Sequence, residues 1–553
     1  MNKPQAFGKL GLMKMAWIVF VFSAATTLTA TAQTFNTLSS FDVTDGDDPY
    51  YGRLVQGFDG NLYGTTSGGG ANDNGTAFKI THSGTLTTLY SFCSQSGCTD
   101  GAFPAVGLAL GIDGNFYGTT EDGGTNSYGT VFKITPSGTL TTLHSFDFTD
   151  GVHPLGQLVQ ATNEDFYGTT YIGGANEDGT VFKITPSGTL TTLYSFCSQS
   201  ACADGQYPQA GLVQATNGNF YGTTYAGGTD AAGTVFEITP AGKLTTLHSF
   251  DCTDGSGAMA GLVQATNGNF YGTTYACGSY DYGVVFKITP SGTLTVLHSF
   301  DTTNGEAPIA GLVQATNGSF YGTTVAGGAD NEGTVFEITP AGKLTTLHSF
   351  CPQSGCTDGA SPYAGLTQAT NGTFYATTNG GGADGDGTVF SLSVGLGPFV
   401  ETLFASGKVG ANVIVLGNNL TGTTSVSFNG TAATFKVVSS TEITTTVPTG
   451  ATTGTVEVTT PSGTLDSNVE FRLTPQITSF SPTSGAVGTI VTITGISLTQ
   501  TTSVTFGGVK APSFTVNSDT QVMATVPTGA KTGKIGIATP GGTAASATSF
   551  TVN

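Results

Sequence analysis

Short runs of alternating apolar and polar residues recur along most of this chain. The unit from Ala310 to Phe350 contains four such runs, which read AGLVQAT, SFYGTT, TVFEIT and LTTLHSF. Alternation over about four to eight residues is typical of β-strands that bury one face. Asn-Gly after the first run and Pro-Ala-Gly after the third indicate tight hairpins. Each unit therefore predicts four antiparallel strands, here named a, b, c and d.

The unit occurs seven times. The string YGTT, or YATT once, begins at Tyr63, Tyr117, Tyr167, Tyr221, Tyr271, Tyr321 and Tyr375. Repeated four-stranded units of this length are typical of the blades of a β-propeller. The last unit lacks strand d, whereas residues 34–42 (TFNTLSSFD) match strand d and precede the first unit.

We therefore predict an all-β chain that begins, over residues 33–396, with a seven-bladed β-propeller. An N-terminal outer strand should close the ring by pairing beside the stretch around Thr388, which would leave no free sheet edge. A parallel β-solenoid is the alternative, but its coils are shorter and would not need the displaced strand.

A second duplication follows the propeller repeat. SVSFNG, VPTGA and TTPSGT appear in one copy, and SVTFGG, VPTGA and ATPGGT follow in the same order in the next. This pattern predicts two immunoglobulin-like β-sandwiches, at residues 397–473 and 474–553.

Both repeats resemble known families. GTVFKITPSGTLTTLHSF and GLVQATNGNFYGTT resemble the GloVer tandem-repeat family of exported bacterial proteins, over about residues 33–396. SPTSGAVGTIVTITG, at residues 481–495, is typical of IPT/TIG domains, and in exported bacterial proteins such domains act as spacers or surface contacts. The resemblance implies a fold but no particular activity.

The first 32 residues predict a signal peptide. Lys3, Lys9 and Lys14 precede an apolar run at residues 16–25, and Ala30-Thr31-Ala32 fits a cleavage site. An uncleaved anchor is the alternative, but the run is short for a membrane span. We expect a secreted or cell-surface monomer with no membrane span after cleavage.

The strong negative charge of the propeller limits the classes of partner that it can bind. Without residues 1–32 the formal charge is 13 − 36 = −23, and the propeller holds 30 acidic against 7 basic residues. Of those acidic residues, 24 fall in the loops between strands d and a and between b and c, which share one face. This acidic field argues against nucleic acid and anionic membranes as partners. Cations, basic proteins and uncharged glycans remain.

The eight cysteines predict four disulfides in an oxidising compartment. Three pairs are local, namely Cys93 with Cys98, Cys197 with Cys202, and Cys351 with Cys356. Cys252 and Cys277 lie in adjacent loops of one blade and form the predicted fourth pair. Metal binding by these cysteines is the alternative.

Each blade places an acidic or amide residue before strand a, directly followed by glycine. These are Asp45, Asp100, Asp150, Asp204, Asp254, Asn304 and Asp358. A ring of carboxylates at the channel mouth would suit calcium, the one cofactor that we consider. Alternatively, Asp-Gly simply forms the turn.

Tyr171, Tyr225 and Tyr275 follow strand b on the same face. Tyrosines beside carboxylates suit a sugar site, and packing between blades is the alternative. His144, His248, His298 and His348 recur in strand d, where Tyr or Ser replaces them in other blades, and we interpret them as surface residues. Glu237 and Glu337 each co-occur with a lysine, Lys243 or Lys343, which suggests ion pairs across the c–d hairpin.

No metalloprotease, serine hydrolase, CxxC or phosphate-loop motif is present. We therefore predict a binding or adhesion protein that uses its acidic loop face for an extracellular glycan or protein ligand. The alternative is a secreted hydrolase or lyase that acts on an extracellular polysaccharide through loop carboxylates.

Overall fold

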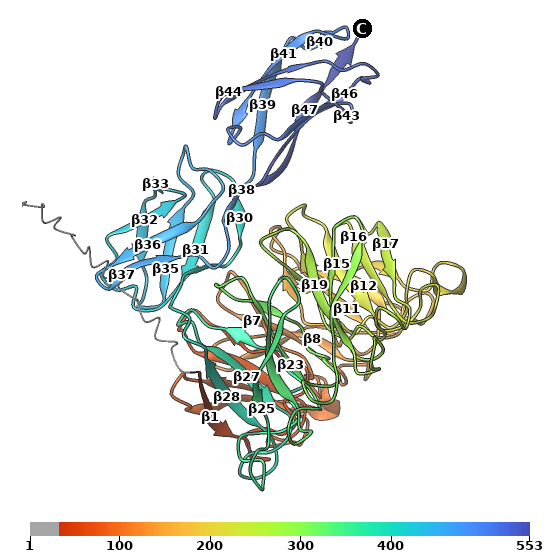
Figure 1. Ribbon diagram of the computed structural model, residues 1–553, viewed down its shortest axis with the longest axis vertical. Coiled ribbons are helices and arrows are strands. Elements are labelled where there is room, and N and C mark those ends of the chain that lie inside the picture. The colour runs from red at the N-terminus through yellow and green to blue at the C-terminus, as the bar shows by residue number, and fades with distance from the viewer. Residues whose placement is uncertain (1–32) are drawn as a thin grey trace, which may run out of the picture.

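The computed structural model describes residues 33–553, so the predicted signal peptide lies outside the described residues. The described chain is nearly all β-structure, with two short 3₁₀ turns, η1 (Ser96–Cys98) and η2 (Ser200–Cys202). Seven four-stranded sheets come first and two sandwiches follow (Figure 1). Between Gln33 and Asn553, no helix is long and apolar enough to cross a membrane.

Each blade consists of four antiparallel strands whose order in the sheet is a, b, c and d. The a strands are β2 (Val55–Gln56), β6 (Ala109–Leu110), β10 (Val159–Gln160), β14 (Val213–Gln214), β18 (Val263–Gln264), β22 (Val313–Gln314) and β26 (Thr367–Gln368). The b strands are β3 (Leu62–Thr66), β7 (Phe116–Thr120), β11 (Phe166–Thr170), β15 (Phe220–Thr224), β19 (Phe270–Thr274), β23 (Phe320–Thr324) and β27 (Phe374–Thr378).

The outer half of each blade contains strands c and d. The c strands are β4 (Thr76–Ile80), β8 (Thr130–Ile134), β12 (Thr180–Ile184), β16 (Thr234–Ile238), β20 (Val284–Ile288), β24 (Thr334–Ile338) and β28 (Thr388–Ser393). The d strands are β5 (Leu86–Ser91), β9 (Leu140–Ser145), β13 (Leu190–Ser195), β17 (Leu244–Ser249), β21 (Leu294–Ser299), β25 (Leu344–Ser349) and β1 (Thr34–Ser40). Strands b are buried along their whole length, whereas strands d are partly exposed because they form the rim.

The N-terminal strand closes the ring, as the sequence predicts. Strand β1 pairs antiparallel with β28, from Thr34 opposite Ser393 to Ser40 opposite Thr388. In Figure 1 these two strands, red-brown and teal, lie side by side although they come from opposite ends of the propeller sequence.

Aromatic contacts hold neighbouring blades together. A phenylalanine after strand d packs edge-on against one in strand c of the next blade, as in Phe92 on Phe132, with ring centroids 5.0 Å apart. The same contact crosses the closure, where Phe41 meets Phe78 at 5.2 Å. Apolar burial, which drives folding at roughly 25 cal/mol per Å², therefore continues around the whole ring.

Glu237 shows that the sequence-based explanation of the charge pattern was wrong. No ion pair joins Glu237 to Lys243, or Glu337 to Lys343, in the described residues. Instead, the Glu237 carboxylate accepts hydrogen bonds from Asn219 at 2.6 Å and from the Tyr221 hydroxyl at 2.9 Å. Its side chain faces strand b and the a–b hairpin rather than the c–d hairpin.

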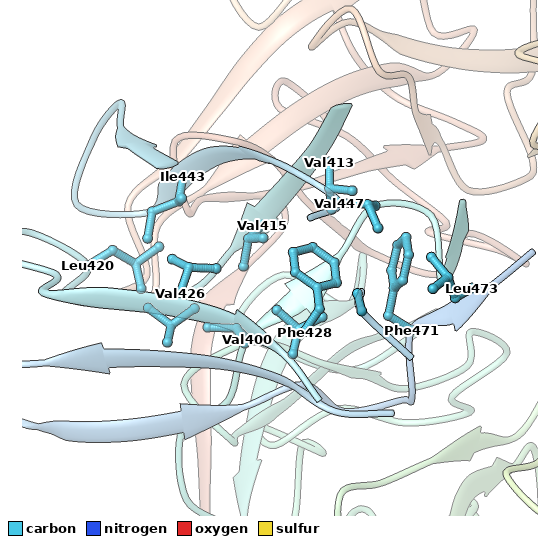
Figure 2. Packing of buried hydrophobic residues seen from close by; sticks show 13 residues of the cluster. Val400, Val413, Val415, Leu420, Val426, Phe428, Ile443, Val447, Phe471 and Leu473 are labelled. Atoms are coloured by element: carbon cyan, nitrogen blue, oxygen red, sulfur yellow. The ribbon is translucent and has the colours of Figure 1, made fainter. Parts of the chain in front are cut away.

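The first sandwich has two main sheets. One contains β29 (Glu401–Thr402), β31 (Asn412–Leu416), β35 (Glu442–Thr446) and β34 (Phe435–Val437). The other contains β33 (Thr431–Ala432), β32 (Ser425–Phe428), β36 (Val456–Thr460) and β37 (Gly463–Asp466), and a parallel pair joins β30 (Ser406–Gly407) to β38 (Arg472–Leu473). Figure 2 shows the apolar core between the sheets, where Phe428 and Phe471 meet edge to face at 5.0 Å.

The second sandwich repeats this plan. One sheet contains β39 (Gln476–Ser481), β41 (Ile490–Ile496), β45 (Gln521–Thr525) and β44 (Phe514–Ser518). The other contains β40 (Ser484–Gly485), β47 (Gly542–Val552), β46 (Gly533–Thr539), β42 (Ser503–Phe506) and β43 (Val509–Lys510).

The first sandwich packs directly on the propeller. The Thr441 hydroxyl donates to the carbonyl oxygen of Phe58 at 2.7 Å, and Asn418 donates to the Thr370 hydroxyl at 2.7 Å. Leu416 is 4% exposed and belongs to the same apolar cluster as Tyr63 and other propeller residues. These contacts place the sandwich beneath the a–b hairpins, opposite the acidic loop face.

Candidate functional site

The loops that precede strands a have a fixed geometry. Each places one residue in the left-handed region, with φ from 51° to 64°: Asp48, Phe103, His153, Tyr207, Gly257, Ala307 and Ser361. In the second blade, the Phe103 N–H donates to Asn74 of the preceding blade, and its carbonyl accepts from Glu121. The same two bonds recur in the five following blades. The chain keeps six non-glycine residues in this costly conformation, so neighbouring loops are held in register around the ring.

A cavity of 430 Å³ occupies the centre of the ring, where the a strands converge. Its volume falls within the range of about 300–1,000 Å³ that small-molecule sites occupy. Apolar side chains such as Leu155, Met259 and Ile309 line it, together with Tyr51 and Tyr363. No Asp, Glu, His or Cys is among the described residues that line this cavity.

One position just before strand a is glycine in most blades, which lets neighbouring backbones pack closely around the cavity. This position, directly before the conserved leucine, is Gly107, Gly211, Gly261, Gly311 and Gly365 in five blades. A Cβ atom at Gly107 would lie 2.4 Å from the carbonyl oxygen of Arg53, so the strands could not approach so closely with a side chain there. The other two blades place Arg53 and Gln157 at this position, and both side chains line the cavity.

Among the described residues that line the cavity, Arg53 is the one with a charged side chain. Its Nε–H donates to the Thr367 hydroxyl at 3.3 Å. Burial lowers the pKa of the Arg53 guanidinium, and the Glu401 carboxylate of the first sandwich acts in the opposite direction. Gln157 differs from Arg53 because its amide donates to the Leu108 carbonyl at 2.8 Å and is thereby fixed.

Three tyrosines form a cluster at the cavity. Tyr50 meets Tyr51 edge to face at 4.1 Å and stacks on Tyr363 at 4.8 Å. Burial raises the pKa of Tyr51 and of Tyr363, so both hydroxyls remain protonated donors at neutral pH. Tyr50, Tyr51, Tyr363 and Arg53 were not predicted from the sequence, although each departs from the repeat consensus and could have been found that way.

The tyrosines predicted from the sequence occupy different environments. Tyr171 packs on Tyr207 of the next blade with ring centroids 5.2 Å apart. Tyr225 covers Gly257, also in the next blade, where a Cβ atom would lie 3.0 Å from its ring. Tyr275 is 44% exposed. None of these three described tyrosines lines the central cavity.

The predicted ring of carboxylates is not assembled. Asp100 is fully buried and accepts hydrogen bonds from the Tyr90 hydroxyl at 2.6 Å and from Ser94 of its own loop. The other positions, Asp45, Asp150, Asp204, Asp254, Asn304 and Asp358, likewise accept bonds from their own loops. Within residues 33–553, no group of possible metal ligands contains two of these residues. They shape the turns, and the structure does not bring them together for calcium.

The recurring histidines have a defined partner, which corrects their interpretation as plain surface residues. Nε2 of His144, His248 and His348 lies 2.7 to 2.8 Å from the turn aspartate of its blade. In blades that have tyrosine instead, the phenol donates to the same aspartate, as Tyr194 does to Asp204 at 2.7 Å. The exchange of His for Tyr preserves a donor to the turn aspartate.

The cysteines form four bridges with the pairing that the sequence predicts: Cys93–Cys98, Cys197–Cys202, Cys252–Cys277 and Cys351–Cys356. Three close short loops, and Cys252–Cys277 joins the two long loops of the fifth blade. All lie on the acidic loop face and none contributes a side chain to the lining of the central cavity.

A second, wider cavity of 1,130 Å³ lies between the first sandwich and the underside of the propeller. Strands β31, β34 and β35 form one wall, and Ile112, Thr162 and Glu164 of two a–b hairpins form the other. Lys408, Lys436 and several threonines line it.

Comparison with known families identifies the propeller repeat and the sandwiches. The Gloeobacter/Verrucomicrobia repeat matches residues 21–216 and 198–390, and the IPT/TIG domain matches residues 398–472 and 475–552. The chain therefore belongs to the Gloeobacter/Verrucomicrobia repeat family and contains two IPT/TIG domains. No curated protein matches it significantly.

Solved structures with similar folds have diverse functions. A fungal alcohol oxidase in complex with copper is 13% identical, with 78% of this chain and 98% of that chain covered and a TM-score of 0.44. A gluconolactonase from Xanthomonas campestris is 12% identical over 66% and 90% of the chains, with a TM-score of 0.34. A surface glycan-binding protein from Prevotella bryantii is 18% identical over 28% and 41%, with a TM-score of 0.22. The similar structures thus include binding proteins and enzymes, and at these TM-scores they favour neither function.

Proposed function

We propose that this chain is an extracellular binding protein that recognises a glycan at the mouth of the central propeller channel. The single observation that carries the proposal is the composition of the cavity: tyrosines and apolar residues line it, and no described lining residue is a carboxylate or imidazole. Glycoside hydrolysis ordinarily uses two carboxylates that flank the scissile bond. The lining therefore favours recognition over hydrolysis.

The tyrosine cluster has the chemistry that sugar binding requires. An aromatic ring covers the apolar face of a pyranose, and a phenol exchanges hydrogen bonds with its hydroxyls. Asp48 and Glu121 act electrostatically on Tyr363 and Tyr51 respectively, so carboxylate acceptors lie near the same hydroxyl donors. Four disulfides are typical of exported proteins and support an extracellular location.

A glycan array followed by calorimetry on the best hit tests the proposal. We expect Tyr51→Ala and Tyr363→Ala each to weaken binding about tenfold, because aromatic contacts contribute about 0.5–1.5 kcal/mol beyond burial and a hydroxyl is lost as well. Tyr280→Ala is the matched control, since Tyr280 is 58% exposed and does not line the cavity.

Two results would overturn the proposal. One is an array without hits, or hits whose affinity is unchanged by both cavity variants. The other is the release of new reducing ends or unsaturated products from a bound polysaccharide, which would establish the enzymatic alternative.

A further inference from the structure

Arg53, which lines the central cavity, uses one of its hydrogen-bond donors within the protein. A guanidinium carries five N–H donors, and the Arg53 Nε–H is bonded to Thr367. Across residues 33–553, the other four donors of Arg53 have no hydrogen-bond acceptor. Arg53 is half-buried, and none of its nitrogens is a buried atom without a partner, so these N–H groups remain accessible and can donate to a ligand that supplies acceptors.

The nearest opposite charge does not satisfy these donors. Glu401 acts electrostatically on Arg53, but no ion pair of 4.0 Å or less joins them. Burial raises the pKa of Glu401 more than Arg53 and a hydrogen bond from Asn468 lower it, so its ionised form is disfavoured. The guanidinium therefore retains much of its capacity for an anion.

We propose that the cavity selects a sugar acid, whose carboxylate binds the terminal N–H groups of Arg53 while its ring contacts Tyr51 and Tyr363. This inference rests on the proposed function and adds the class of ligand. A guanidinium presents paired donors that match the two oxygens of a carboxylate, which makes Arg the usual residue for such recognition.

The acidic face does not exclude such a ligand. The described cavity lining contains no carboxylate. Asp48 and Glu121 act electrostatically on Tyr363 and Tyr51, whereas the carboxylate that acts on Arg53 is that of Glu401. A pair formed inside the cavity is screened much less than one between exposed charges, so Arg53 can bind an anion although the loop face is acidic.

The sugar acid has two possible sources, a free uronic acid or the terminal residue of an acidic polysaccharide. Calorimetry or ligand-observed NMR with D-galacturonate, trigalacturonate and D-galactose distinguishes them. Tighter binding of the trimer than of the monomer indicates a polysaccharide end, and equal binding indicates the free acid. In both cases the proposal requires that galacturonate or trigalacturonate bind at least about tenfold more tightly than D-galactose.

Substitutions then assign the preference to Arg53. Arg53→Gln should reduce galacturonate affinity about tenfold or more and leave galactose affinity unchanged, because one charge-assisted bidentate contact is lost. Glu401→Gln should preserve galacturonate binding, because Glu401 forms no ion pair with Arg53. Lys343→Gln is the matched control, since it removes an exposed positive charge from a c–d hairpin.

The double variant Arg53→Gln/Glu401→Gln guards against misfolding, because it leaves neither charge unpaired. If it unfolds at the wild-type temperature and still prefers galacturonate, the inference is overturned. It is also overturned if wild type binds no acid, or binds acid and neutral sugar equally. If the wild type binds acid and neutral sugar equally and Tyr51→Ala weakens that binding, the proposed function stands although the preference for a sugar acid does not.

Discussion

At the scale of single residues, departures from the repeat mark the places where the ring is asymmetric. In six blades the YGTT tyrosine packs on a phenylalanine of the next blade, as Tyr63 does on Phe116 at 4.0 Å. At the closure Leu62 replaces that phenylalanine, and Tyr375 stacks on His82 at 5.1 Å instead. The imidazole fills the space that an aromatic ring occupies elsewhere.

His82 should make the closure sensitive to acid. Burial lowers the pKa of His82 below its ordinary value of 6.5, and its buried Nε2 has no hydrogen-bond partner. Because the folded state holds the neutral ring, the stability contributed by His82 is present above pH 6.5 and is lost as the pH falls below it. We expect His82→Phe to raise the free energy of unfolding by about 1 kcal/mol at pH 8, and by more at pH 5.

Urea unfolding of both proteins across this pH range measures the effect. Parallel pH profiles for wild type and variant would show that His82 does not titrate on unfolding. The measurement at pH 8 is an internal control. At that pH the variant gains stability because it removes the unpaired Nε2, and the further gain in the free energy of unfolding at pH 5 is the part that depends on protonation of His82.

At the scale of elements, the strand that comes first in the chain completes the last sheet. Strand β1 contributes Phe35, which stacks on Phe390 at 5.2 Å, and the next residue after the strand is the fully buried Phe41. Seven identical four-stranded units in sequential order would leave the first and last blades joined by packing alone. The displaced strand adds backbone hydrogen bonds across the closure.

Phe41→Ala should therefore destabilise the whole propeller. We expect a loss of about 3–5 kcal/mol in the free energy of unfolding, as for other buried phenylalanines. Val43→Ala is the control, because Val43 is 51% exposed two residues further along. Chemical denaturation measures both; a small effect of Phe41→Ala, similar to that of the control, would mean that closure contributes little to stability.

At the scale of the whole molecule, the two faces of the propeller have different roles. The loop face carries the acidic residues and the mouth of the cavity, and the hairpin face holds the first sandwich through Leu416, Thr441 and Asn418. The second sandwich is joined to the first by Gln500, which bonds to the backbone of Thr453. In Figure 1 it extends to the far end of the molecule, where the C-terminus lies.

Leu416→Ala should loosen the contact between the propeller and the first sandwich. Removal of a buried leucine side chain costs about 2–5 kcal/mol, and here the cost falls mainly on the docked state. We expect a larger radius of gyration in small-angle X-ray scattering, without a change in the far-ultraviolet circular dichroism. Val438→Ala, at a position that is 48% exposed, should scatter as wild type does; an unchanged profile for Leu416→Ala would show that other contacts are sufficient for docking.

The sequence alone determined the architecture of this protein, because the architecture follows from local, repeated signals. Alternation, Asn-Gly turns and the spacing of YGTT specify four strands per unit, and the unmatched run at residues 34–42 specifies how the ring closes. The cysteine pairing was also predictable, because each pair lies in one loop or in adjacent loops of one blade.

Only the tertiary structure decided the site. Arg53, Tyr51 and Tyr363 converge because segments from different blades meet at the axis. Each departs from the repeat consensus, but the sequence does not show that these three departures come together in space. The recurrence of the turn aspartates in the sequence suggested a ring of carboxylates. In the structure each carboxylate instead accepts hydrogen bonds from its own blade. A repeat predicts what its copies share, whereas the site depends on the few positions where the copies differ and on how the blades bring those positions together.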